Sequence, residues 1–104
     1  MNHQVYPNTT SIAGEVVEVT DLGESKAHGY KVVLTLHNPH KQRESFSMNV
    51  KVVLYGKQAE KYMTAHGNPP INQTIILITG RLAVEKDGSM FVIAHKFHPM
   101  EALT

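Results

Sequence analysis

VVLYGKQAEKYMTAHGNPPINQTIILITGRLAVEKDGSMFVIA, residues 52–94, combines a strand, a short helix, a strand, a glycine-containing turn and a further strand without interruption. Residues 57–66 leave the two-residue period of a strand for helical spacing, with one side formed by Ala59, Tyr62, Met63 and His66. Gly67 is placed to end this helix, because Pro69 and Pro70 cannot continue it. Few small architectures have this order of elements.

The rest of the chain adds three strands before this helix and extends the pattern to five. Alternation and β-branched residues predict strands at 11–19, 30–37, 45–55, 74–84 and 90–97. Polar segments at 21–29, 38–44 and 85–89 separate them, and the last contains an Asp-Gly pair that favours a tight hairpin. Residues 1–10 have no period and are expected to form a flexible arm. With no repeat or linker, residues 1–104 are expected to form a single domain.

The two faces of the third strand differ in chemistry. Its predicted core face carries Phe46, Met48, Val50, Val52 and Leu54. The opposite face carries Ser45, Ser47, Asn49, Lys51, Val53 and Tyr55. In the second strand, Tyr30 alternates with Val32, Leu34 and Leu36 on one face. Tyr30 and Phe46 are therefore expected to pack in the core, while Tyr55 ends a largely polar face.

Composition excludes several classes of function. Ten Lys and Arg against nine Asp and Glu give a formal net charge of +1, so any basic surface must be local. The absence of cysteine excludes disulfides, thiolate metal sites and a catalytic thiol. The first residues do not form a secretory signal, and no apolar stretch approaches the roughly 20 residues of a membrane span. We expect a cytoplasmic protein that makes no contact with membranes.

Metal binding and catalysis find no support in the pattern of residues. His95 and His98 are three apart in a strand and are expected on opposite faces, and His37 and His40 flank a proline turn without a carboxylate or thiol at ligand spacing. No nucleophile motif, phosphate-binding glycine loop or acid–base pair is present in the sequence. The chain is therefore expected to need no metal or cofactor and not to be an enzyme.

The order of elements predicts an all-β protein, a five-stranded Greek-key barrel with one short helix between strands 3 and 4, known as the OB fold. The segments VVLYGKQAEKYM and IILITGRL closely resemble bacterial single-stranded DNA-binding proteins. In both, an apolar strand ends in an aromatic residue, a glycine and a basic residue before a short helix, and a later strand ends in Gly, a polar residue and Leu. The resemblance covers the middle and later half of the chain.

This resemblance implies that single-stranded DNA lies across an exposed barrel face, with bases stacked on aromatic rings and phosphates paired with cations. Tyr55 matches the family's aromatic residue at the end of strand 3, Lys51 matches a basic position near it, and Arg81 follows Gly80 where the family has a polar residue. Tyr55 fits either a half-buried edge position or a stacking role. The other candidates for nucleic-acid contact are Lys31, Lys41, Arg43, Lys57 and Phe91.

Some of these residues leave two interpretations open. Lys41 and Arg43 fit a solvated loop or a flap that grips phosphates, and Phe91 fits either face of its strand. The family commonly stacks bases on tryptophans, but this chain has none, and Asn49 and Asp87 stand where two of them are expected. The glycine-rich linker and acidic tip of the housekeeping proteins are also missing from this sequence, as in phage or plasmid-borne relatives and in primosomal replication protein N.

The resulting hypothesis is a homodimer or homotetramer that binds single-stranded DNA with little sequence preference in DNA replication, recombination or repair. One alternative is a primosome or replication-restart module that acts mainly through contacts with replication or recombination proteins. Another is a structural barrel that docks a partner protein.

Overall fold

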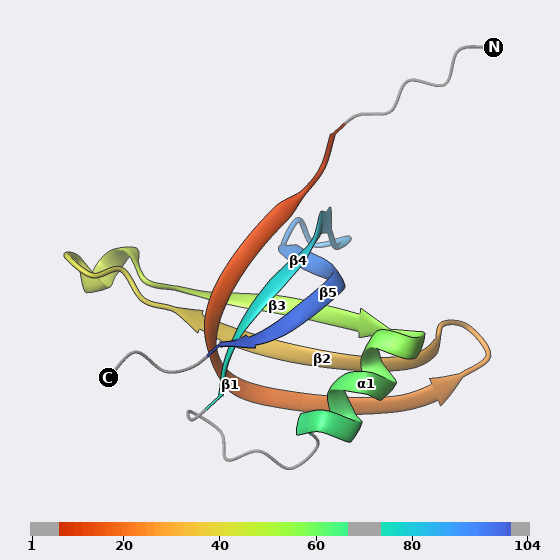
Figure 1. Ribbon diagram of the computed structural model, residues 1–104. Coiled ribbons are helices and arrows are strands. Elements are labelled where there is room, and N and C mark those ends of the chain that lie inside the picture. Colours follow the sequence, from red (N-terminus) through yellow and green to blue (C-terminus); the bar gives the residue numbers. More distant parts are fainter. Residues whose placement is uncertain (1–6, 67–73, 101–104) are drawn as a thin grey trace.

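The computed structural model of the chain describes residues 7–66 and 74–100, which fold into a closed barrel of five strands with one helix (Figure 1). The strands are β1 (Thr10–Ser25), β2 (Gly29–Asn38), β3 (Met48–Tyr55), β4 (Ile75–Val84) and β5 (Met90–Met100). Helix α1 (Gly56–His66) lies between β3 and β4, and a short 3-10 helix, η1 (Glu44–Phe46), precedes β3. Neighbouring strands follow the order β1-β2-β3-β5-β4, and β4 pairs with β1 to close the barrel. The predicted five-stranded barrel is confirmed.

Apolar residues at alternate positions of every strand fill the barrel, as the two-residue period of a strand requires. On β3, Val52 and Leu54 are fully buried in this core, as are Val32 and Leu34 on β2. The remaining strand residues of the core are Val16, Leu36, Val50, Ile76, Ile78, Val92 and Ala94. Tyr30 packs against this cluster at its edge and donates a hydrogen bond from its hydroxyl to Asp21 Oδ2 (2.8 Å).

Strand β1 is longer than the sequence predicts, so the loop expected at 21–29 is wrong for residues 21–25, and a turn at 26–28 leads into β2. Its first part pairs with β4, and its second part pairs with β2 as far as Ser25 opposite Gly29. Figure 1 shows this strand curving along the barrel. Two register shifts against β2 accommodate the curvature, and Gly23 takes a φ of 67° at the second, where side chains are disfavoured. Glycine and charged residues therefore mark a bulged strand here and not a loop.

Gly80 allows β4 and β5 to approach closely. A Cβ atom at this position would lie 2.0 Å from the Ile93 carbonyl oxygen, a backbone atom with little freedom to move. The register shifts here, because Thr79 pairs with Lys96 whereas Gly80 pairs with Ala94. The strict alternation expected between His95 and His98 is therefore interrupted. Within residues 7–66 and 74–100, no group of three or more His, Cys, Asp or Glu side chains is arranged to hold a metal ion.

Helix α1 begins at Gly56 and packs on β2, β3 and β5. Ala59 and Tyr62 are fully buried, Met63 packs against the core, and the ring of Tyr62 meets Phe97 of β5 edge to face, with centroids 5.6 Å apart. The helical spacing predicted for these residues is thus confirmed. The side chain of His66 and the helix-ending residues Gly67, Pro69 and Pro70 lie outside the described residues. No helix in the described ranges has the length and apolar character to cross a membrane.

Strand β3 begins later than predicted, which corrects the expected core positions of Phe46 and Met48. Residues 44–46 form η1 instead of a strand, so the alternation inferred for 45–55 does not reach Phe46. Phe46 is 58% exposed, and Met48, the first residue of β3, is 51% exposed because it projects beyond the closed part of the barrel. The core face of β3 therefore consists of Val50, Val52 and Leu54.

We predict that Gly80→Ala lowers the free energy of unfolding by about 1–3 kcal/mol, the usual cost of forcing extra atoms into a packed site. The reason is the 2.0 Å approach of the added Cβ to the Ile93 carbonyl oxygen. Urea denaturation measures this, with the exposed neighbour Arg81→Ala as the control, expected within about 0.5 kcal/mol of wild type. Equal stability of the two variants would contradict the close approach.

Candidate nucleic-acid interface

The outer face of β2, β3, β5 and β4 brings together most of the predicted contact residues. On β3, Lys51, Val53 and Tyr55 alternate with the core residues and point outward. Paired residues on neighbouring strands share a face. Lys31 of β2 pairs with Tyr55, Ile93 of β5 pairs with Val53, and Arg81 of β4 pairs with Ile93. We call this surface the outer face.

An apolar floor lies between the charged residues of the outer face. It is formed by Val33, Val53 and Ile93, which are consecutive partners across β2, β3 and β5. Val53 is only 2% exposed although it lies outside the cluster that fills the barrel, so its outer neighbours cover it. The floor holds the backbone of three strands in a fixed relation, which places the cations and rings around it.

At one end of the floor, Tyr55 and Lys31 form a cation–aromatic pair. The Lys31 ammonium lies over the Tyr55 ring, 5.7 Å from its centroid, which is within the range of a cation–π attraction. Tyr55 is 36% exposed. This exposure fits both roles that the sequence left open for Tyr55, and its ring shares the outer face with cations. Lys57 follows in the first turn of α1 and is exposed.

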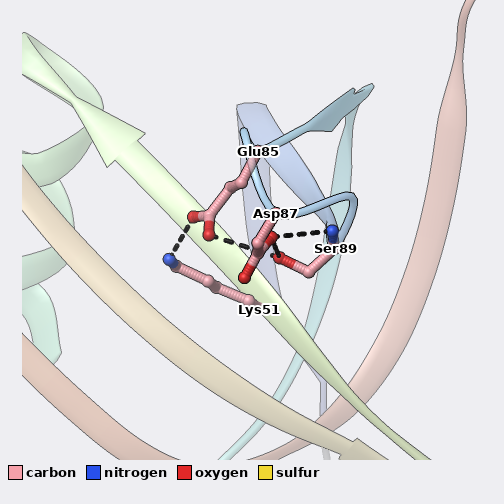
Figure 2. Close-up of polar contacts among 4 residues, drawn as sticks. All are labelled: Lys51, Glu85, Asp87 and Ser89. Carbon is pink, nitrogen blue, oxygen red and sulfur yellow. Dashed lines mark hydrogen bonds and ion pairs between the residues drawn. The ribbon is translucent and has the colours of Figure 1, made fainter.

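At the other end, Lys51 is engaged twice, as Figure 2 shows in part. Its ammonium forms an ion pair with Glu85 Oε1, in the turn that follows β4, and lies 5.8 Å from the centroid of the Phe91 ring. Phe91 is half-buried and precedes Val92, an inward residue, so its ring belongs to the outer face. Phe91 thus lies on the same face as Lys51.

The turn 85–89 is held by its own side chains (Figure 2). Asp87 Oδ1 accepts hydrogen bonds from the backbone N–H of Ser89 at 2.9 Å and from its Oγ at 2.6 Å, and Ser89 Oγ also donates to Glu85 Oε2 at 3.3 Å. The hydrogen bond from Lys51 is the main cause that lowers the pKa of Glu85, and the bonds from Ser89 lower the pKa of Asp87. Both carboxylates are therefore held in the charged form.

The loop between β2 and β3 carries a second aromatic group, which sequence reasoning missed. The Arg43 guanidinium lies over the Phe46 ring at 5.3 Å, and the His40 ring meets Phe46 edge to face at 5.4 Å. Phe46 was assigned to the core because its position fits the alternation of β3. The polar run before it, which contains Pro39, was the signal that the strand begins later.

Lys41 and Arg43 are exposed in this loop, apart from the other candidates. The residues of β3 that precede Tyr55 separate it from the loop, and the strand spans roughly 23 Å from Met48 to Tyr55 at about 3.3 Å per residue. Figure 1 shows the loop and α1 at opposite ends of β3. The outer face thus brings together Lys31, Lys51, Tyr55, Arg81 and Phe91. Lys57 adjoins the Tyr55 end, and Lys41 and Arg43 adjoin the other.

Solved structures with the same fold include single-stranded DNA-binding domains. The chain is similar to the SSB domain of a protein from Synechococcus sp., with a TM-score of 0.70 and 16% identity over 92% of this chain and 99% of that chain. It is similar to the second single-stranded DNA-binding protein of Mycobacterium smegmatis, SSBb, with a TM-score of 0.69 and 15% identity over 90% and 89% of the two chains. The chain has the OB fold.

A third similar structure is the dimeric N-terminal domain of PriB from Thermoanaerobacter tencongensis. Its TM-score is 0.68, with 15% identity over 91% of this chain and 98% of that chain. No protein-family model matches the sequence, and no curated protein matches it either. The OB-fold barrel expected from the order of elements is therefore confirmed by structure, at low sequence identity.

Polar groups occupy both positions where the resemblance placed tryptophans. Asn49 pairs with His37 across β3 and β2, and its Oδ1 lies 2.9 Å from His37 Nδ1, within hydrogen-bonding distance. Asp87 is bonded to Ser89 in the turn before β5. The rings on the outer face are instead Tyr55 and Phe91, each with a lysine ammonium over it.

We predict that Lys51→Met raises the pKa of Glu85 toward its ordinary value, and that Ser89→Ala raises it less, because Lys51 is the larger cause of the lowering. A carboxyl ¹³C titration by NMR measures both. Since the folded pKa lies below the unfolded one, the stabilisation by this carboxylate is complete above the unfolded pKa and is lost as the pH falls through the folded pKa. An unchanged Glu85 pKa in Lys51→Met would contradict the ion pair.

Proposed function

We propose that this protein binds single-stranded DNA across the outer face, with little sequence preference and without catalysis. The observation that carries the proposal is the presence, on one face of an OB-fold barrel, of two aromatic rings each with a lysine ammonium over it. Stacking on an aromatic ring accepts any base, and lysine and arginine neutralise phosphates without reading sequence. Similar solved structures are single-stranded DNA-binding proteins, which supports the same ligand for this chain.

The proposed path of the DNA strand follows from the position of these groups. Bases stack on Tyr55 and Phe91, and phosphates pair with Lys31, Lys51 and Arg81 around the apolar floor. Arg81 is exposed and forms no ion pair within the described ranges, so its charge is available. Lys57 extends the path past Tyr55, and Lys41, Arg43 and Phe46 extend it past the start of β3. Such a path fits the roughly 4–16 nucleotides that one OB fold binds.

We place this activity in DNA replication, recombination or repair in the cytoplasm, where single strands are exposed. The net charge of the whole chain is only +1, so the attraction of DNA depends on the cations of the outer face and its surroundings. This predicts a modest affinity for DNA. Binding in the micromolar range is therefore expected.

We further propose that two or four copies associate through the tip of the β4–β5 hairpin. Leu82, Val84 and Met90 continue the inward rows of β4 and β5 beyond the barrel and are 38%, 63% and 60% exposed. Leu82 and Met90, with Met48 and Phe91, border an apolar hollow of about 290 Å³. A second copy fits this surface because exposed apolar patches mark association sites, and the similar PriB domain is dimeric. A replication or recombination protein on this surface is the alternative occupant.

We predict that a fluorescein-labelled oligo-dT binds in the micromolar range by anisotropy. The logarithm of its affinity should fall against the logarithm of salt with a slope of about −2, for three phosphates neutralised. Tyr55→Ala should weaken binding about 5- to 150-fold through loss of stacking, while Tyr55→Phe retains it. Arg81→Ala should reduce the salt slope, and Arg81→Lys should preserve it. Binding without salt dependence, or no binding, would contradict the proposal.

We predict that Val84→Lys together with Met90→Lys shifts the mass in light scattering from dimer or tetramer to monomer, because the lysines place like charges on a contact that must exclude water. The matched control is Glu18→Lys, an exposed position on β1. A monomeric wild-type protein would refute self-association and direct the search to a protein partner of the same surface.

A further inference from the structure

The ion pair of Lys51 with Glu85 joins three separate elements at one end of the outer face. Lys51 comes from β3, Glu85 from the turn after β4, and the ring beneath the ammonium is Phe91 of β5. Figure 2 shows the two charged side chains pointing toward each other, with Asp87 and Ser89 beside them. The side chains of Lys51 and Glu85 are 42% and 35% exposed, so the pair remains in contact with water.

In this arrangement, the two groups that a nucleotide would use are occupied by each other. The ammonium that would meet a phosphate is neutralised by Glu85, and the same ion pair holds this ammonium beside the Phe91 ring that would accept a base. A phosphate that approaches Lys51 also meets the charges of Glu85 and Asp87. Both carboxylates are kept ionised by their hydrogen bonds, since the pKa of each lies below its ordinary value.

The other end of the outer face is arranged differently. Lys31 lies over Tyr55 without an ion pair among the described residues, and Arg81 likewise has none. Both rings have an ammonium over them, so the two ends differ in the ion pair and not in the cation–ring contact. We call Tyr55 and Lys31, with Arg81 beside the apolar floor, the open half of the interface, and Phe91 and Lys51 the closed half. An arriving DNA strand therefore meets outer-face cations without an ion pair only at the open half.

We propose that Glu85 is an acidic latch on the closed half: a DNA strand reaches Phe91 only when one of its phosphates replaces the Glu85 carboxylate on Lys51. This inference rests on the proposed binding of single-stranded DNA. One exchange frees both groups, because the ammonium that leaves Glu85 for the phosphate also moves from above the ring. Exposed ion pairs are weak, so the latch opens under the pull of the phosphate but lowers the affinity of every bound strand.

The latch gives the acidic turn 85–89 a specific role, which the net charge of the chain does not indicate. Asp87 and Ser89 fix the turn through their mutual hydrogen bonds and so hold Glu85 opposite Lys51. Glu85 is then a positioning residue, which acts through Lys51 and does not itself contact the strand. Its removal should strengthen binding, whereas removal of Lys51 should weaken it.

The test is an anisotropy titration of fluorescein-labelled oligo-dT with wild-type protein, Glu85→Gln, Asp87→Asn, Lys51→Met and the double variant Lys51→Met/Glu85→Gln. Glu85→Gln keeps an oxygen that accepts from Lys51 but loses the charge, and we expect it to tighten binding about 2- to 5-fold, the range of an exposed ion pair. Asp87→Asn removes the same charge from the same turn and keeps an oxygen for Ser89, so a smaller gain is expected. In the Lys51→Met background, Glu85→Gln should give no gain.

The outcomes separate the latch from the proposed function. If wild-type protein binds oligo-dT with salt dependence but Glu85→Gln binds no tighter, the latch is refuted and the function stands. If the gain from Glu85→Gln persists without Lys51, or Asp87→Asn equals it, a general charge effect replaces the latch. If neither wild-type protein nor Glu85→Gln binds, both proposals fail. Circular dichroism and thermal unfolding confirm that each variant is folded.

Discussion

The two-residue alternation of β3 determines both the packing of the barrel core and the chemistry of the outer face. Its even-numbered residues, Val50, Val52 and Leu54, fill the barrel, so Lys51, Val53 and Tyr55 must face outward. A shift of one residue would bury a lysine and expose the core, so core packing fixes the register of the strand. The same packing therefore fixes where the cations and rings of the outer face stand.

Much of the fold was predictable from the sequence because its local signals agree. The helix between the third and fourth strands, the Asp-Gly hairpin and the five apolar strands each follow from a short-range pattern. The curvature of β1 was not predictable in this way. It depends on the pairing of β1 with two different strands, β4 and β2, and on two register shifts against β2. Phe46 was misplaced for a related reason: alternation continues through it although the strand does not.

The sequence predicted which side chains of β3 share the outer face, but it did not predict which residues of other elements contact them. Alternation along β3 placed Lys51 and Tyr55 on one face, and strand pairing shows that the candidates Lys31, Arg81 and Phe91 lie on the same face. Glu85 was not predicted to belong to this site, since no local pattern links it to a lysine 34 positions earlier. Closure of the barrel creates this contact. Of the two lysines beside the rings of the outer face, Lys51 is paired with Glu85, and Lys31 has no ion pair among the described residues.

Methyl NMR with and without oligo-dT shows directly whether single-stranded DNA lies on the outer face of β2, β3, β5 and β4. Val33, Val53 and Ile93 form the outer floor, whereas Leu36, Val52 and Ile78 lie inside the barrel. We expect oligo-dT to shift the methyl signals of the outer set and to leave the inner set nearly unchanged. Shifts confined to methyls elsewhere, with the outer floor unperturbed at saturation, would contradict it.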